Sequence, residues 1–548
     1  MNVAEAVGRT LAELGPPDVF GLIGSGNFAV SNALVAAGAR FVTARHEGGA
    51  ISMADAYAQV TGDLGLCTVH QGPGLTNAVT GLTEAAKSRT PLVLVAADTA
   101  AAAIRSNFRI GQDQLVTAVG AIAERVHTPG SAVADTVRAV RRARVERRPV
   151  VLMLPLDVQA MPCPDATLPA PLPVARPTRP ALSAIDEAVD ALSRAERPLI
   201  IAGRGARVGA AREPLLRLGD VVGALFATSA VANGLFSGSP WALGISGGFA
   251  SPTAAELIGQ ADVVLGVGVA LNMWTTRHFK LLSPSATVIQ IDQDADAIGA
   301  HHRADLGIVG DAAESVVALI AELQRRGYEG AGWRTLEMAR RIAAGSWQQT
   351  PFDDQSDGGR LDPRRLSLEL DALLPDERTV AIDSGHFMGY PSMYLRVPDE
   401  RAFVFTQAFQ AVGLGLASAI GAAVARPDRL AVAALGDGGT MIGLADLETV
   451  ARRGLRMLVV IYNDAAYGAE VHHFGPHGHP LDLVRFPDVD FAAVGRSFGL
   501  CGLTVRTPAD LAGVTTWLAD GGRPGMVLDA KVVPTVVAEW LEEAFRGH

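Results

Sequence analysis

The sequence predicts an α/β fold built from three doubly wound parallel-sheet domains. Short apolar runs alternate with amphipathic, helix-like stretches along the whole chain, which is the pattern of parallel sheets with helical crossovers. Two polar or proline-rich stretches interrupt this alternation. The chain has 548 residues, more than one hydrophobic core supports, because domains usually hold about 100–200 residues.

In the first part, near-continuous apolar runs predict strands that are buried on both faces of a sheet. These runs cover residues 64–69, 92–96 and 150–154. Helices are expected between them at 48–59, 76–87 and 133–147.

The same alternation continues through the rest of the chain. Strands are expected in the middle part at 199–202, 263–267 and 288–291, and in the third part at 379–382, 430–434 and 457–462. The first and third parts are candidates for distant copies of one architecture.

Two linkers set the predicted domain boundaries. Residues 162–180 contain seven prolines, which favour an extended conformation over regular structure. Residues 345–363 are polar and rich in Gln, Asp and Gly. We therefore expect domains at residues 1–165, 181–344 and 360–548.

Composition excludes several classes of protein. The chain is 49% apolar and 19% charged, which excludes a disordered protein. Its net charge is −10 and it has no basic run, so no nucleic-acid partner is expected. The three cysteines form no CxxC motif and indicate no disulfide framework. With no signal peptide evident, and a longest apolar run (412–425) too short to cross a membrane, we expect a cytoplasmic protein with no membrane partner.

Chemistry-bearing residues follow two neighbouring strands of the third part. Leu-Gly-Asp-Gly-Gly-Thr (435–440) follows the strand at 430–434, and Asn-Asp-Ala-Ala-Tyr-Gly (463–468) follows the next one. Carboxylate and amide oxygens suit octahedral Mg²⁺. Glycines allow backbone N–H groups to approach phosphate oxygens. The two motifs together predict a site for Mg²⁺ and a diphosphate.

At this point the sequence resembles the thiamine-diphosphate enzymes of the acetolactate synthase, pyruvate decarboxylase and benzoylformate decarboxylase superfamily, whose signature is Gly-Asp-Gly followed by Asn-Asn. The resemblance spans the chain. It implies Asp437, Asp464 and the Ala466 carbonyl as metal ligands, with Asn463 as the alternative to Asp464. It further implies cofactor contacts from Gly436, Gly438, Gly439, Asn463, Tyr467 and Gly468.

A second segment, Arg45-His46-Glu47-Gly48-Gly49-Ala50, resembles the Arg-His-Glu-x-Gly-Ala segment of the same family. The resemblance implies that Glu47 binds ring nitrogen N1′ of the cofactor's aminopyrimidine and is catalytic. Without that context, Glu47 would be a carboxylate at a helix start, where it interacts with the helix dipole.

The loop 69–77 resembles the family's Ser-Gly-Pro-Gly-x-Thr-Asn loop, which places Gly72, Pro73 and Asn77 near the pyrimidine. His70 stands where the benzoylformate decarboxylase branch carries an active-site His, and we expect either an acid/base role or a satisfied loop histidine. Gln112 resembles a glutamine that faces the active site in acetolactate synthases.

The segment 405–415 resembles the family's loop that holds the cofactor in its bent conformation. The resemblance implies that Val412 is the wedging residue and that the Gln410 carbonyl accepts from the 4′-amino group. It also implies that Gly385 and His386 contact the diphosphate. Glu470 aligns with a glutamate that protonates the intermediate in pyruvate decarboxylases; a solvated Glu at a helix start is the alternative.

The middle part carries weaker signals. Gly203-Arg204-Gly205 is a lone Gly-x-Gly, a poor indicator of a nucleotide site. The Arg-Phe-Asp-Asp-Arg segment with which acetolactate synthases bind FAD is replaced by residues 269–274. We therefore favour a structural domain, with FAD or another nucleotide as the less favoured alternative.

The resemblance implies a homo-oligomer, a dimer or dimer of dimers, in which Glu47 and Asp437 meet across a subunit interface. The expected function is decarboxylation of a 2-oxo acid followed by carboligation, dependent on thiamine diphosphate and Mg²⁺. One alternative is a 2-oxo acid decarboxylase that releases an aldehyde; His70 and Glu470 favour this alternative. The other is a non-catalytic paralogue that binds the cofactor.

Overall fold

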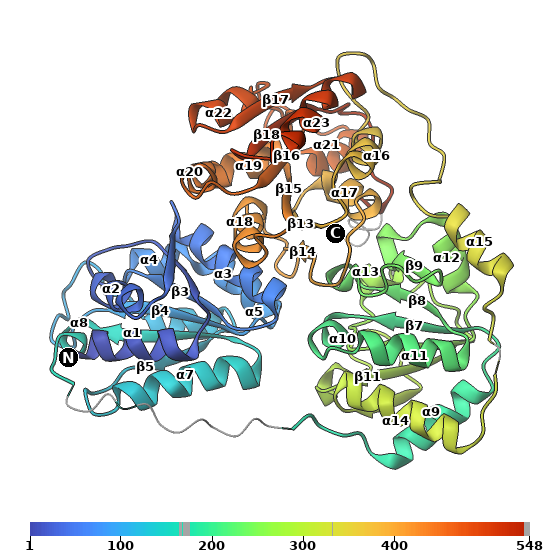
Figure 1. The fold of residues 1–548 in the computed structure, drawn as a ribbon, viewed down its shortest axis with the longest axis horizontal. Helices are drawn as coiled ribbons and strands as arrows, with labels where there is room; N and C mark the ends of the chain where they lie inside the picture. Colours follow the sequence, from blue (N-terminus) through green and yellow to red (C-terminus); the bar gives the residue numbers. More distant parts are fainter. Residues whose placement is uncertain (164–166, 168–175, 331, 542–548) are drawn as a thin grey trace.

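The computed structural model describes residues 1–163, 167, 176–330 and 332–541. Within these residues the chain forms three six-stranded sheets, each flanked by helices, and the three domains meet around a common centre (Figure 1). The predicted α/β fold with three doubly wound parallel sheets is confirmed.

The first sheet begins the chain, and all its strand pairs are parallel. Its strands are β1 (Asp18–Gly21), β2 (Arg40–Thr43), β3 (Gly65–Val69), β4 (Leu92–Asp98), β5 (Ile122–Arg125) and β6 (Pro149–Pro155). Its helices are α1 (Val3–Leu14), α2 (Phe28–Ala36), α3 (Glu47–Thr61), α4 (Pro73–Asn77), α5 (Val79–Lys87), α6 (Gln112–Ala118), α7 (Ala132–Glu146) and α8 (Leu156–Gln159).

The predicted strands of this domain are confirmed, but the single helix expected at 76–87 is wrong. The segment is divided into α4 and α5 at Ala78, whose N–H bonds to the Leu75 carbonyl three residues back. Helix α4 starts earlier than expected because Pro73 occupies its first position, where a fixed φ favours the helix.

The middle sheet has the order β12-β11-β10-β7-β8-β9. Its strands are β7 (Pro198–Ala202), β8 (Leu225–Thr228), β9 (Ala242–Ile245), β10 (Val263–Val267), β11 (Thr287–Asp292) and β12 (Leu306–Val309). Its helices are α9 (Leu182–Ser193), α10 (Arg204–Val208), α11 (Arg212–Val222), α12 (Pro252–Gly259), α13 (Met273–Thr276), α14 (Ala312–Arg325) and α15 (Leu336–Ala344), with 3-10 turns η1 (Ala230–Ala232), η2 (Gly247–Phe249) and η3 (Ala295–Ala297).

The third sheet has the strands β13 (Arg378–Ile382), β14 (Phe403–Phe405), β15 (Leu430–Gly436), β16 (Met457–Asn463), β17 (Cys501–Val505) and β18 (Met526–Lys531). Its helices are α16 (Pro363–Leu373), α17 (Gly389–Tyr394), α18 (Gly415–Ala425), α19 (Asp437–Gly443), α20 (Leu447–Arg452), α21 (Gly468–Phe474), α22 (Phe491–Ser497) and α23 (Ala512–Ala519), with 3-10 turns η4 (His386–Met388), η5 (Leu444–Asp446), η6 (Gly475–His477) and η7 (Pro508–Leu511).

The first and third sheets share one topology. The first runs β2-β1-β3-β4-β6-β5 and the third β14-β13-β15-β16-β18-β17, which is the same order when strands are counted from the start of each domain. The expected likeness of the two parts is therefore confirmed. In both sheets the strand order reverses next to the first strand of the domain, and ligands of doubly wound sheets bind beyond the strand ends at such a point.

The predicted linkers differ in how much the structure describes. Most of residues 162–180 lie outside the described residues. Among the described residues between α15 and α16, where the second linker is expected, neither helix nor strand is present.

Helix α3 of the first domain packs directly on α18 of the third (Figure 1). A Cβ on Gly421 would lie 2.1 Å from the Met53 carbonyl oxygen, so the two helices approach too closely for any other residue. One cluster of buried apolar side chains runs through both domains. The two domains are thereby held as neighbours within one chain.

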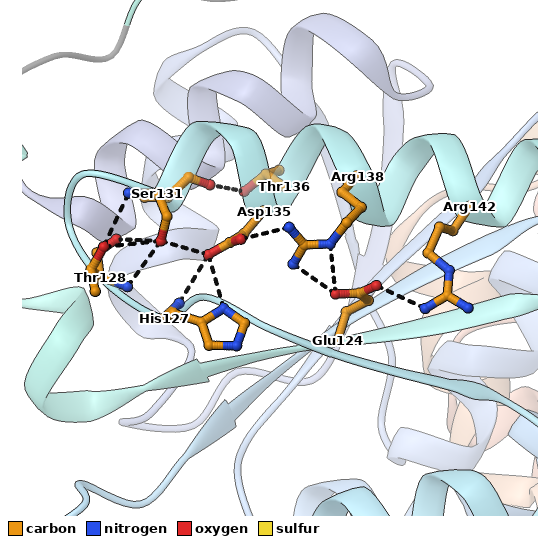
Figure 2. Close-up of polar contacts among 9 residues, drawn as sticks. Glu124, His127, Thr128, Ser131, Asp135, Thr136, Arg138 and Arg142 are labelled. Atoms are coloured by element: carbon orange, nitrogen blue, oxygen red, sulfur yellow. Dashed lines mark hydrogen bonds and ion pairs between the residues drawn. The ribbon is translucent and has the colours of Figure 1, made fainter.

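An ion-pair network holds α7 against strand β5 (Figure 2). Glu124 accepts hydrogen bonds from Arg138 and Arg142, each at 2.8 Å, and Arg138 also donates to Asp135 at 2.8 Å. Burial would raise the pKa of Glu124, but the hydrogen bonds from the two arginines outweigh it and lower that pKa. Strand β5 is the edge strand at the end of the sheet away from the point where the strand order reverses, so we assign the network to stability.

Among the described residues, no helix combines the length and apolar character needed to cross a bilayer.

Candidate active site

A cavity of ≈ 1490 Å³ lies beyond the carboxyl ends of β13, β15 and β16 and continues to the loops of the middle domain. Many of the residues predicted for the diphosphate side line it. They are Gly385, His386, Gln410, Val412, Gly436, Asp437, Gly438, Gly439, Asp464, Ala466, Tyr467, Gly468 and Glu470.

Asp437, which is buried, and Asp464, which is half-buried, form a carboxyl pair in this cavity. Strands β15 and β16 run parallel with Gly436 opposite Tyr462, so the residues that follow them leave the sheet side by side. Burial, and then the charge of Asp464, raises the pKa of Asp437 to about 8; burial also raises the pKa of Asp464 to about 6. Two carboxyls in this position share a proton or bind a cation.

Asn463 points the other way. Its side-chain amide donates to the Asp529 carboxylate at 2.9 Å, and its side-chain oxygen accepts the Ala465 N–H at 3.1 Å. Asn463 is buried, whereas the Asp464 carboxyl accepts the local N–H of Ala466, at 3.2 Å, and lies against the Asp437 carboxyl. The donor set facing the cavity is therefore the two aspartates.

Three glycines near this pair allow the backbone to pack closely against neighbouring side chains. A Cβ on Gly438 would lie 2.5 Å from the Tyr467 ring, and one on Gly468 would lie 2.6 Å from Asp464. A Cβ on Gly439 would lie 2.2 Å from an Asp383 oxygen. Such approaches are open only to glycine. They bring backbone N–H groups close to the carboxyls, as a diphosphate site requires.

His386 lines the cavity as a neutral imidazole. Its Nε2 accepts the backbone N–H of Ala538 at 2.9 Å, so Nδ1 carries the ring hydrogen. Burial, and then the neighbouring His472, lowers the pKa of His386 to about 3. Gly385 precedes it with φ +142°, a conformation that favours glycine. The segment presents a hydrogen-bond donor without a charge.

The loop that carries Gln410 and Val412 borders the same cavity. Val412 is 41% exposed, and Gln410 has φ +59°, a conformation that costs energy for a residue with a side chain. Buried Asp383 accepts the N–H groups of Gly413 at 2.9 Å and Leu414 at 3.2 Å. Glu470, half-buried at the start of α21, completes this side of the cavity.

The residues predicted from the first domain form a second group. Glu47 begins α3, is 8% exposed, and accepts the side-chain amide of Asn77 at 3.0 Å. Gly72, with φ +60°, precedes Pro73 and opens α4, which ends at Asn77. The sequence therefore places a buried carboxylate beside an exposed asparagine at the ends of two helices.

His70 and Gln112 are held by defined partners. The Nδ1–H of His70 donates to the Gln71 carbonyl at 2.7 Å, and its Nε2 lies 3.2 Å from the Ser25 hydroxyl. The Gln112 side chain accepts the Gly72 N–H at 2.9 Å and donates to the Ala97 carbonyl at 3.0 Å. Both ends of the buried Gln112 amide are thus used to fix the loop.

The two groups do not meet within one chain. Among the described residues that line the ≈ 1490 Å³ cavity, neither Glu47, His70, Gly72, Asn77 nor Gln112 is present.

Sequence comparisons agree with the fold. Residues 1–119 match the family described as "Thiamine pyrophosphate enzyme, N-terminal TPP binding domain", residues 185–319 its central domain and residues 383–528 its C-terminal TPP binding domain. A sulfoacetaldehyde acetyltransferase of Castellaniella defragrans is 30% identical over 93% of this chain and 89% of its own length. The chain belongs to the thiamine pyrophosphate enzymes.

Other relatives of this enzyme carry different activities in their names. A "Probable 2-ketoarginine decarboxylase AruI" of Pseudomonas aeruginosa is 30% identical over 96% of this chain and 93% of its own length. A "Probable acetolactate synthase large subunit" of Methanocaldococcus jannaschii is 26% identical over 93% and 88%. Family and relatives make this protein a thiamine pyrophosphate-dependent enzyme, a transferase or lyase.

In this thiamine pyrophosphate enzyme the loops of the middle domain form the far end of the cavity. Glycines of these middle-domain loops pack against one another. A Cβ on Gly205 would lie 2.6 Å from the Gly268 Cα, and a Cβ on Gly203 would lie 2.4 Å from the Gly268 carbonyl oxygen. The close packing of two backbone segments explains these glycines.

Some residues of the site carried no sequence signal. Trp540 lines the cavity from the C-terminal segment, where no motif marks it. Asp383 stood beside the predicted Gly385, but its bonds to Gly413 and Leu414 depend on a contact between separate loops. No sequence motif marks Glu84 of α5 either, because its contact is with a loop of the third domain.

Proposed function

We propose that this enzyme uses thiamine diphosphate and Mg²⁺ to decarboxylate a 2-oxo acid and then joins the retained fragment to a second carbonyl compound. The observation that carries this proposal is the carboxyl pair of buried Asp437 and half-buried Asp464 at the ends of β15 and β16. Two carboxylates beside the backbone N–H groups of a glycine-rich loop suit a hard divalent cation that shares its shell with a diphosphate.

The residues present fit such a group. Asp437, Asp464 and the Ala466 carbonyl would hold the cation, while Asn463 stays bonded to Asp529. His386 through Nδ1–H, Gly385 and the glycines of the 436–439 loop would donate to the diphosphate, with Tyr467 and Gly468 beside them. When bound, the cofactor supplies a thiazolium ring that accepts the electrons released on loss of CO₂.

Glu47 would act on the other end of the cofactor. Its buried carboxyl would bond to N1′ of the aminopyrimidine, with Gly72, Pro73 and Asn77 at the ring and the Gln410 carbonyl on the 4′-amino group. Val412 would wedge the two rings together. Glu47 and Asp437 lie in separate groups within the chain, which supports a site shared by two subunits.

Gln112 fits a positioning role better than a catalytic one. Its side-chain oxygen accepts the Gly72 N–H and its NH₂ group donates to Ala97. With both ends engaged inside the first domain, the amide would set the loop that meets the pyrimidine.

Carboligation is favoured because names among the relatives, sulfoacetaldehyde acetyltransferase and acetolactate synthase, describe transfer or synthesis. Release of an aldehyde is the second candidate. Glu470 supports it, because this carboxyl lines the cavity near Asp464, where it could deliver a proton. His70 supports it too, since its Nε2 faces a hydroxyl and could exchange a proton.

For the middle domain we propose a structural role without a nucleotide, since Gly203, Gly205 and Gly268 pack on one another. A bound FAD remains the alternative, and the absorption spectrum of purified enzyme, with or without flavin bands, decides between them.

Calorimetry with thiamine diphosphate in the presence and absence of Mg²⁺ tests the proposal. Binding is expected only with the cation, and no binding in either condition would overturn it. Product analysis with a panel of aliphatic and aromatic 2-oxo acids then separates the two outcomes. Hydroxyketones indicate carboligation, free aldehydes indicate decarboxylation alone, and binding without turnover indicates the non-catalytic alternative.

A further inference from the structure

The loop from Thr406 to Leu414 contains a residue in a strained conformation. Its own domain fixes one end of this loop. Gln410, in its middle, has φ +59°, a conformation that costs energy for a residue with a side chain. Asp383 accepts the N–H groups of Gly413 and Leu414 and so fixes the C-terminal end. A strained residue stays in place only when both sides of it are held.

The N-terminal end of this loop is held by the first domain. Glu84, on α5, accepts the Ala408 N–H at 3.0 Å with one carboxyl oxygen and the Phe409 N–H at 2.6 Å with the other. Ser88 donates to the same carboxylate at 3.2 Å. Glu84 is 1% exposed, so these bonds form out of water, where hydrogen bonds to a charged acceptor are strong.

Titratable groups from two other elements lie near Glu84. Arg204 of the middle domain lies close enough that the Glu84 charge acts on its guanidinium. Asp55 of α3 is also near, and burial, then the charge of Glu84, raises the pKa of Asp55 to about 7. Glu84 therefore lies where all three domains meet, with two N–H donors from the third and a cation from the second.

We propose that Glu84 is a positioning residue: its carboxylate fixes residues 408–409 and thereby sets the Gln410 carbonyl and the Val412 side chain against the pyrimidine end of the cofactor. This inference rests on the proposed function, since it needs thiamine diphosphate in this cavity. Glu84 contacts neither the cofactor nor the metal ligands and acts through the backbone of the loop.

The position of Glu84 predicts which half of the cofactor depends on it. The diphosphate would be held by Asp437, Asp464 and the glycine loops, none of which bonds to Glu84. Its loss should therefore weaken contacts to the aminopyrimidine and leave the contacts to the diphosphate intact.

The substitution Glu84→Gln tests this. An amide has one acceptor oxygen, and its NH₂ group would face the second N–H donor. Calorimetry should show thiamine diphosphate with Mg²⁺ binding about tenfold or more weakly, while inorganic pyrophosphate with Mg²⁺ binds within about twofold of wild type. The apparent KM for the cofactor should rise, and exchange of its C2 proton in the saturated enzyme should slow.

Asp55→Asn is the matched control. Asp55 is buried in the same cluster and bonds to Gln59, not to the loop, so both ligands should bind as to wild type. Glu84→Asp keeps the charge beside Arg204 but is one methylene shorter, and an intermediate loss of thiamine diphosphate affinity is expected. If Glu84→Gln does not fold, titration of Glu84→Asp with thiamine diphosphate and with inorganic pyrophosphate, each with Mg²⁺, tests the inference instead.

Equal affinities of wild type and Glu84→Gln for both ligands would overturn the inference. An equal loss of both ligands would overturn it as well, because Glu84 would then act on the whole domain. If wild-type enzyme itself binds inorganic pyrophosphate but not thiamine diphosphate, the proposed function fails, which is a different result from either of these.

Discussion

The side-chain amide of Asn463 donates a 2.9 Å hydrogen bond to the buried carboxylate of Asp529. This bond joins the end of β16 to the neighbouring strand β18 and turns Asn463 away from the cavity. The next residue, Asp464, is left to face Asp437. The hydrogen bonds of Asn463, to Asp529 and to its neighbours Ala465 and Val489, thus decide which of two adjacent polar residues is available to a cation.

Substitutions at the two positions should therefore have different effects. Asp464→Ala should weaken Mg²⁺-dependent binding of thiamine diphosphate by about 100-fold or more, because a direct ligand would be lost. Asn463→Ala should instead lower the free energy of unfolding by about 1–2 kcal/mol, since Asp529 loses a buried donor. Calorimetry and urea unfolding measure the two effects; the reverse pattern would identify Asn463 as the ligand.

The Asp437 and Asp464 pair predicts how the stability of the cation-free enzyme depends on pH. The pKa values of both residues in the folded state, about 8 and about 6, lie above that of an unfolded aspartate, near 4. Their contribution to stability is therefore present in full below about pH 4 and is lost as the pH rises through these values. With a chelator present, the Tm should fall more between pH 5 and 9 for wild type than for Asp464→Asn. Parallel curves would contradict the coupled pair.

The network on α7 should matter for stability and not for the site (Figure 2). Glu124→Gln should lower the free energy of unfolding by about 1–2 kcal/mol, a value kept small because Arg138 and Arg142 are each more than one-third exposed. Glu146→Gln removes only an exposed partner of Arg142 and should cost about 0.5 kcal/mol or less. Cofactor affinity should be unchanged by Glu124→Gln, and a change would show that the network reaches the site. Glu146 itself lines the large cavity, on the side of the middle-domain loops, so only its effect on stability is compared.

Features that depend on nearby residues could be predicted from the sequence, whereas contacts between residues far apart in the chain could not. The strands were predictable because their residues are buried on both faces and therefore apolar throughout. Asp437 and Asp464 were predictable as neighbours because adjacent parallel strands end at one edge of a sheet. The direction of Asn463 was not, since its partner Asp529 lies 66 residues further on. The hydrogen bond from the Ala408 N–H to Glu84 joins two domains and residues 324 positions apart in the sequence, and no motif marks either residue.

Glu47→Gln tests the role proposed for the carboxyl of the first domain. A glutamine keeps an oxygen that can accept from Asn77, so folding and Tm should change little. It cannot share a proton with the aminopyrimidine, so exchange of the cofactor's C2 proton should slow by about 10²–10⁴-fold. Exchange followed by NMR at saturating cofactor measures this. Unchanged exchange would remove Glu47 from the activation step.

The shared site can be tested by mixing two inactive variants. Within one chain Glu47 does not line the cavity that Asp437 lines, and we propose that the partner subunit supplies it. Glu47→Gln and Asp437→Asn should each be inactive alone, because every site in either homodimer lacks one of the two groups.

After the two variants are dissociated, mixed in equal amounts and reassociated, half of the dimers contain one chain of each. In such a dimer one site combines the intact Glu47 of one chain with the intact Asp437 of the other, and the second site lacks both. Activity should return to about one-quarter of the wild-type value for a two-fold symmetric dimer. A site built within one chain would give no recovery, since no chain in the mixture carries both residues, and the cross-subunit arrangement would then be excluded.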